Sequence, residues 1–255
     1  MISMKYYKNQ LCLLLFVLAS SFGFCLGQES DSLFNLGVKA LSERNFGVAK
    51  ELFVKDIDNQ LSYESYYNLG LTYAGLENWN AAYWAFESAL KIKPNDNEAA
   101  YNAKLALEHI DSKISWNHPY SWSRRMVLIL PVNIWFFISF IFAIGLGVTL
   151  YFLITLSRKK YRYGLTRTLF IVMIPMFLIT YFSGISAKKH FENFDYVIPT
   201  TKNVTTYIAM NGIALNEPLK NGMRYQFIKE SGDWVQLKFS DNRPVWVKKE
   251  QVGYY

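Results

Sequence analysis

The chain has 255 residues, of which 51% are hydrophobic, and a formal net charge of +7, so it has room for one large domain or two small ones. Its surplus basic residues stand in two short segments and the remaining charges balance, so we expect no nucleic-acid partner. The surplus residues are Lys5, Lys8, Arg158, Lys159, Lys160, Arg162 and Arg167.

Residues 1–27 have the pattern of a secretory signal peptide. Two lysines precede the apolar run LCLLLFVLASSFGFCLG, and small residues stand near a cleavage point after Gly27. Cleavage there would remove both cysteines of the chain, and we then expect no disulfide and no cysteine-based metal site. Two alternatives stay open. One is a lipid anchor at Cys25, which Phe24 disfavours because a small residue is usual at that position, and the other is an uncleaved anchor.

Residues 28–110 contain an internal repeat. The run FNLG at 34–37 recurs as YNLG at 67–70, and a weaker copy, AYNAK, stands at 100–104. This pattern resembles the tetratricopeptide repeat (TPR), a helix–turn–helix unit of about 34 residues. We therefore expect an all-α, TPR-like array with two repeats and one capping helix at about 97–110.

Small residues and helix breakers in the central repeat fit this expectation. Gly70 and Ala82 are small enough to let the two helices of the repeat approach closely. Pro94 cannot continue a helix and is expected to end the second one. Asn95, followed three positions later by Glu98, predicts the cap of the next helix.

The resemblance to TPR domains implies a peptide-binding groove lined by the first helix of each repeat. Its candidate residues are an asparagine and the aromatic residue before it in each copy. They are Asn35, Asn68, Asn102, Phe34, Tyr67 and Tyr101. The alternative interpretation is that these asparagines bond within the array and that the rings pack between helices.

Two long apolar runs predict a membrane hairpin. Residues 127–156 and 168–186 are each long enough for a transmembrane helix of about 20 residues. The basic loop 157–167 between them indicates the cytoplasmic side, so both flanking parts should face the periplasm. Residues 111–126 hold tryptophan, tyrosine and arginine, which favour the bilayer surface, and predict an interfacial connector. Neither run contains an ionisable residue within its apolar part, so a transporter or channel is not expected.

Residues 187–255 predict a small all-β barrel. Short strand-like runs alternate with turn signals such as Asn221-Gly222. The runs are 196–198, 206–209, 224–228, 233–238 and 244–247. Their order resembles a bacterial SH3-like domain, which implies an aromatic cleft for peptides or cell-wall peptides formed by Tyr225, Trp234 and Trp246. The alternative is that these three residues form the core of the barrel.

The chain carries no phosphate-binding loop, zinc-protease motif or nucleophile motif. We therefore expect a protein that is not an enzyme and has no cofactor and no metal site. As a whole, the order of signal peptide, short TPR array, membrane hairpin and SH3-like domain resembles the BatE family of the Bat (aerotolerance operon) group of bacterial membrane proteins. This resemblance spans the chain but rests on architecture, and only its TPR part is specific in sequence.

The resemblance implies a location in the bacterial inner membrane, with other Bat proteins that carry von Willebrand A domains as partners and a MoxR-type ATPase nearby. It also implies a role in an envelope complex linked to oxidative-stress tolerance. Our first hypothesis is a periplasm-facing scaffold that binds membrane partners through its TPR array. The alternative is a cell-wall or envelope sensor that binds peptidoglycan or peptides through its SH3-like domain, and a third option is a subunit of an enzyme complex.

Overall fold

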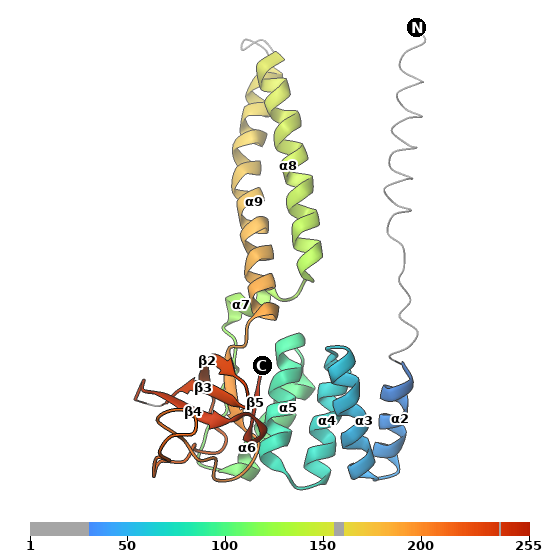
Figure 1. Ribbon diagram of the computed structural model, residues 1–255. Helices are drawn as coiled ribbons and strands as arrows, with labels where there is room; N and C mark the ends of the chain where they lie inside the picture. The colour runs from blue at the N-terminus through green and yellow to red at the C-terminus, as the bar shows by residue number, and fades with distance from the viewer. Residues whose placement is uncertain (1–30, 156–160, 240) are drawn as a thin grey trace. The chain divides into compact units, whose positions relative to one another are not determined.

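The computed structural model describes residues 31–155, 161–239 and 241–255. The chain is mostly helical with one small antiparallel sheet (Figure 1), as the composition of predicted elements indicated. The predicted signal peptide at 1–27, including Cys25, and residues 157–160 of the basic loop lie outside the described residues.

The first part of the described chain is an array of consecutive helices (Figure 1). They are α2 (Asp31–Ser42), α3 (Phe46–Asn59), α4 (Tyr63–Gly75), α5 (Trp79–Ile92) and α6 (Asn97–Ile110). From α3 onward each helix packs on the next. The bounds of α6 confirm the expected last helix of the array, but the predicted cap was wrong. Asp96, and not Asn95, accepts the N–H of Ala99 at 2.8 Å, because Asn95 instead bonds Arg125.

The two copies of the repeat make the same close helix–helix contact. A Cβ atom on Gly37 would lie 2.7 Å from the ring of Phe53, and one on Gly70 would lie 2.5 Å from the ring of Phe86. Side chains larger than glycine would therefore push the paired helices apart. This is the close approach that the sequence predicted at Gly70, and it recurs at the corresponding position of the first copy.

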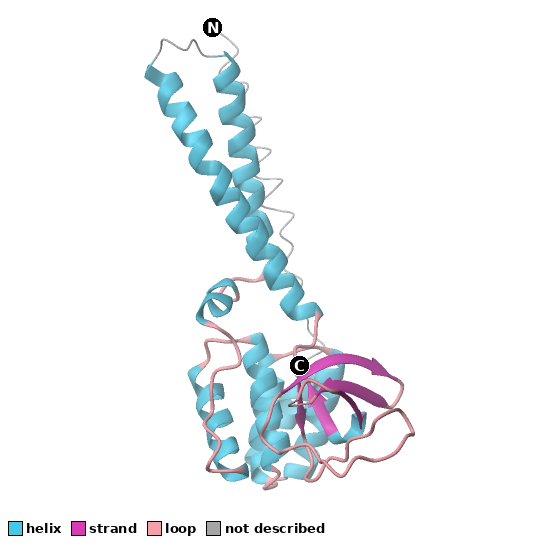
Figure 2. Cartoon of the chain, turned by 90° about the vertical axis from the view of Figure 1, so that its left-hand side faces the viewer, coloured by secondary structure: helices cyan, strands magenta, loops and turns pink. Residues whose placement is uncertain are grey.

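Two long apolar helices follow the short helix α7 (Trp122–Val127): α8 (Val132–Thr155) and α9 (Tyr161–Glu192). They lie side by side (Figures 1 and 2) and are joined by a hydrogen bond from Ser139 Oγ to Thr180 Oγ1 of 3.0 Å. By length and composition both could cross a membrane. The second helix is longer than the predicted 168–186. It starts inside the predicted loop 157–167 and continues beyond Ser186, because no proline stands between residues 161 and 168 or between 186 and 192.

The C-terminal part forms a five-stranded sheet in the order β4-β3-β2-β1-β5, with every pair antiparallel. The strands are β1 (Tyr196–Pro199), β2 (Tyr225–Ser231), β3 (Trp234–Lys238), β4 (Pro244–Lys248) and β5 (Val252–Tyr254). Among the described residues the sheet is unclosed, so barrel closure is not observed. The predicted strand 206–209 is reduced to isolated bridges of Tyr207 with Ala214 and Trp246, since the chain turns at Ala209–Gly212.

The sheet shares a hydrophobic core with the helices. Strands β1 and β5 pack on α5, and Gly253 of β5 lies so close to Trp84 that a Cβ atom there would be 2.2 Å from the indole nitrogen. Ile198 and Tyr255 belong to the same buried cluster as Phe86 of α5. The helical array, α2 to α6, and the part of the chain from β1 to β5, which we call the β part, therefore form one packed unit built around α5. The β part also has a core cluster of its own.

Candidate functional site

Helices α4 and α6 bring part of the predicted groove together. Asn102 Nδ2 donates to the hydroxyl of Tyr67 at 3.0 Å, and that hydroxyl lies 3.5 Å from Glu98 Oε2, to which it donates. Tyr63 stacks on Tyr67 with 5.9 Å between ring centroids. Tyr101 is 67% exposed and stands three positions after Glu98, so the two are neighbours on the surface of α6. We call these five residues the α4–α6 face.

Tyr63 and Tyr67 of the α4–α6 face are neutral hydrogen-bonding groups. Burial, together with the hydrogen bond to Asp96, raises the pKa of Tyr63. Burial followed by the charge of Glu98 raises the pKa of Tyr67. A positive charge stands next to them, because Lys93 Nζ lies 4.1 Å from the centroid of the Tyr63 ring and 2.6 Å from Glu64 Oε1. The face thus offers aromatic surface, neutral hydroxyls and a carboxylate to a ligand.

The other predicted groove residues lie apart from this face. Asn68 Nδ2 donates to the carbonyl of Glu64 within its own helix, at 2.9 Å. Phe34 packs on Phe53 with 6.1 Å between centroids, and Asn35 is exposed on α2. The interpretation that the asparagines bond within the array therefore describes Asn68 and, in part, Asn102.

The predicted aromatic cleft of the β part is not formed by its three residues together. Tyr225 and Trp246 are buried, with exposed fractions of 6% and 7%, and the hydroxyl of Tyr225 accepts the N–H of Lys220 at 2.8 Å. Trp234 is half-buried and packs edge-on against Tyr207, with 4.9 Å between centroids. Trp234 lines a cavity of about 450 Å³ with polar neighbours. The sequence did not identify Tyr207 as part of this aromatic group.

A buried carboxylate that the sequence did not identify links three distant segments. Glu87 of α5 is fully buried. Arg224 donates to both of its oxygens, at 2.9 and 2.7 Å, and Trp116 Nε1 and the hydroxyl of Tyr255 each donate at 2.8 Å. Burial alone would lower the pKa of Arg224, but the Glu87 carboxylate outweighs it and raises that pKa above its usual range. The cluster joins α5 to the connector before α7 and to the β part.

A second buried cluster joins the end of α9 to α5. His190 is fully buried, and its Nε2 donates to the carbonyl of Lys91 at 2.9 Å. Lys91 Nζ donates to the carbonyl of Asn193 at 2.8 Å. Asp195 pairs with Arg124 at 3.0 Å and lies 3.8 Å from Nδ1 of His190. The long apolar helix α9 is therefore fixed to the helical array and is not joined to it by a free linker.

This second cluster makes stability depend on pH. Burial lowers the pKa of His190 below its usual 6.5, so in acid the unfolded chain binds a proton that the folded protein resists, and stability falls as the pH drops below that value. Burial also lowers the pKa of Lys91 to about 8 from 10.5, so stability rises with pH between these values. The other groups that face His190 are Tyr120, Arg124, Asp195 and Phe191.

We expect the thermal midpoint of the protein to fall more steeply below pH 6.5 than that of a His190→Gln variant. Thermal unfolding of both proteins at a series of pH values measures this, with the acidic residues as a background common to both. Burial lowers the pKa of His118 as well, so the variant should keep part of the acid sensitivity. Parallel curves for the two proteins would contradict the role of His190.

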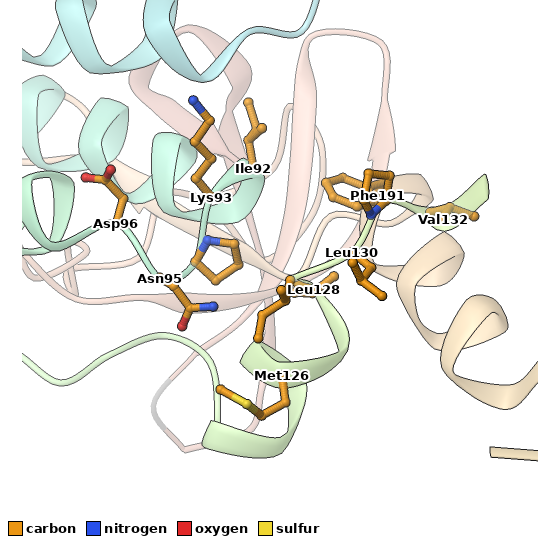
Figure 3. Close-up of a pocket in the computed structure, with 12 residues that line it drawn as sticks. Ile92, Lys93, Asn95, Asp96, Met126, Leu128, Leu130, Val132 and Phe191 are labelled. Carbon is orange, nitrogen blue, oxygen red and sulfur yellow. The ribbon is translucent and has the colours of Figure 1, made fainter. Parts of the chain in front are cut away.

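A groove of about 810 Å³ lies between the α5–α6 turn and the segment that joins α7 to α8. Figure 3 shows Lys93, Asn95 and Asp96 on one side of it, and Leu130, Val132 and Phe191 on the other. Most of its lining is apolar. The lining residues are Ile92, Lys93, Pro94, Asn95, Asp96, Met126, Leu128, Ile129, Leu130, Pro131, Val132 and Phe191.

Comparisons of the chain with protein-family models, with curated proteins and with solved structures found no match. Within the described ranges, no group of three or more histidine, cysteine, aspartate or glutamate side chains is placed to hold a metal ion. A functional proposal for this protein therefore rests on its own residues.

Proposed function

We propose that the protein is a membrane-anchored scaffold for protein–protein interactions, with α8 and residues 168–186 of α9 spanning the bacterial inner membrane. The support is that these helices leave large apolar side chains in contact with solvent, such as Phe140 and Ile154, which are 61% and 77% exposed. Apolar patches of this kind are normally covered by a partner or by lipid. Arg162 and Arg167 stand where α9 begins, so this end is proposed to face the cytoplasm. The helical array and the β part then share the periplasmic side.

In this proposal α2 to α6 are two TPR-like repeats with a capping helix, and β1 to β5 are an SH3-like domain. The equivalent contacts of Gly37 with Phe53 and of Gly70 with Phe86 support the TPR-like assignment. The SH3-like assignment has less support, because the sheet is unclosed in the part of the chain that the structure describes. No enzymatic activity is proposed.

The partner is proposed to bind at the α4–α6 face as an extended polypeptide. The observation that carries this proposal is the contact of Asn102 with Tyr67, together with the exposed ring of Tyr101 on the same helix as Asn102. An aromatic ring and amide groups suit a peptide backbone and its side chains. The resemblance to the BatE family suggests the partners: other Bat proteins with von Willebrand A domains, in an envelope complex linked to oxidative-stress tolerance.

Substitution of the exposed ring tests this proposal. We expect Tyr101→Ala to weaken binding of a purified Bat protein with a von Willebrand A domain by about tenfold, which corresponds to the loss of about 1.4 kcal/mol. The affinity is measured by biolayer interferometry on the full-length protein. The control is Glu51→Ala, an exposed position on α3, which should bind as the wild type does.

Unchanged affinity of the Tyr101→Ala variant would contradict binding at this face. The sensor alternative is favoured by one observation, the cavity beside Trp234. It would replace the scaffold proposal if Tyr101→Ala had no effect and Trp234→Ala abolished co-sedimentation of the full-length protein with peptidoglycan.

A further inference from the structure

The groove between the α5–α6 turn and the α7–α8 segment leaves apolar side chains uncovered. Ile129 is 57% exposed, Met126 is 37% exposed and Phe191 is 36% exposed. Together with Leu130 and Ile92 they line the groove. Figure 3 labels Ile92, Met126, Leu130 and Phe191 around it. The volume of about 810 Å³ lies in the range of about 300–1,000 Å³ that is usual for ligand pockets. An apolar ligand or the side chains of a partner would be stabilised here by the removal of this surface from water.

The position of the groove indicates where such a ligand comes from. Val132 is both a wall of the groove and the first residue of α8. The groove therefore lies at the start of α8, whose surface further along the helix exposes Phe140 and Ile144, at 61% and 53%. The opposite wall, which includes Ile92, belongs to the helical array and not to the hairpin.

At the rim of the groove, the cation of Arg125 has no acidic partner in the part of the chain that the structure describes. Arg125 Nε donates to Asn95 Oδ1 at 2.9 Å, and Asn95, which lines the groove, donates back to the carbonyl of Arg125 at 3.3 Å. Among the described residues no acid lies within ion-pair distance of Arg125, whereas the neighbouring Arg124 pairs with Asp195 at 3.0 Å. A guanidinium group whose terminal nitrogens remain available is well suited to a phosphate.

We propose that this groove holds an acyl chain of a membrane phospholipid, with the lipid phosphate at Arg125. This inference rests on the proposed membrane position of α8 and α9. The lipid would fill the apolar space between the end of α5 and the start of α8. It would thereby add to the contacts that fix the hairpin to the helical array.

Photo-crosslinking of the full-length protein tests the proposal. A benzoylphenylalanine is placed in turn at Ile92 in the groove, at Ile144 on α8 and at Tyr101 on α6. Each protein is reconstituted in nanodiscs of phosphatidylethanolamine and phosphatidylglycerol and irradiated. Mass spectrometry then detects covalent phospholipid adducts by their added mass. We expect phospholipid adducts at Ile92 and Ile144 and none at Tyr101.

The outcomes separate the groove from the membrane anchor. An adduct at Ile144 without one at Ile92 would overturn the lipid site and leave the anchor intact. Adducts at neither position would overturn both.

The phosphate contact is tested by Arg125→Gln, which should lower the phosphatidylglycerol adduct at Ile92 by about tenfold, as expected for one charge-assisted hydrogen bond. The control is Arg243→Gln, at an exposed ion pair with Glu217 in the β part, which should leave the yield of the Ile92 adduct unchanged. If that yield were equal with Arg125, with Arg125→Gln and with Arg243→Gln, the phosphate contact would be contradicted.

Discussion

Replacing Glu87 with alanine is expected to lower the free energy of unfolding by about 3–5 kcal/mol, the usual cost of removing one partner of a buried ion pair. The variant would leave the guanidinium group of Arg224, only 18% exposed, without its carboxylate. It would also remove the acceptor of the Trp116 indole and of the buried Tyr255 hydroxyl. Unpaired buried donors are themselves destabilising, because they lose water without gaining another acceptor.

The measurement is denaturant unfolding of the full-length protein in nanodiscs, followed by tryptophan fluorescence. The matched control is Glu108→Ala, since Glu108 is half-exposed and lies 3.7 Å from Lys104, and such surface pairs contribute about 0–1 kcal/mol. A double variant, Glu87→Ala with Arg224→Met, should recover part of the loss because it leaves no buried charge. If Glu87→Ala cost no more than Glu108→Ala, the buried cluster would not stabilise the protein.

Replacing Tyr255 with alanine is expected to cost a similar amount, about 3–5 kcal/mol, as is typical of large buried aromatic residues. Tyr255 is 3% exposed and lies in the core that the helices share with the sheet. Its backbone also pairs with Tyr196 of β1, at 3.1 and 3.2 Å. The loss would therefore open a cavity between β1 and α5 as well as remove a donor to Glu87.

Two further variants separate the contribution of the Tyr255 hydroxyl from that of its buried ring. Tyr255→Phe keeps the ring and removes the hydroxyl, and it should cost about 1–3 kcal/mol because Glu87 loses one donor. Tyr101→Ala removes a tyrosine that is 67% exposed and should change stability by no more than about 0.5 kcal/mol. Equal unfolding free energies for Tyr255→Ala and Tyr101→Ala would show that the shared core does not bear on stability.

The helical elements could be predicted because their signals are local. Small residues such as Gly70 stand where helices touch, and α6 spans Asn97–Ile110 as expected. Most strands were also identified from turn signals; Gly222, for instance, adopts a φ of 73°. The strand expected at 206–209 was wrong, because the hydrogen bonds of Tyr207 with Trp246 continue no further along the chain.

The buried cluster around Glu87 could not be predicted from spacing, because its partners are distant in the sequence: Arg224 and Tyr255 stand 137 and 168 positions away. One local signal was available. Glu87 lies within a helix that is apolar on nearly every side, and such helices are usually buried. An acid at that position was therefore a candidate for a buried carboxylate paired with a cation, and not for a solvent-exposed acid of the kind usual on helix surfaces.

The candidate site was predicted only in part for a similar reason. Tyr67, Tyr101 and Asn102 were identified because the repeat places them at equivalent positions. The groove beside α8 was missed, since its two walls come from segments that carry no shared motif. Sequence patterns indicate which face of one helix is apolar, but not which other segment stands opposite it.

Hydrogen–deuterium exchange of the full-length protein during a urea titration tests whether the helical array and the β part are one folded unit around α5. Peptides that cover α4 and α5 and peptides that cover β2 to β4 are followed in the same samples. We predict that both sets lose protection at the same urea concentration, and that the Glu87→Ala variant shifts both together. Loss of protection in the β peptides while the helical peptides remain protected would contradict a shared core and restore two independent domains.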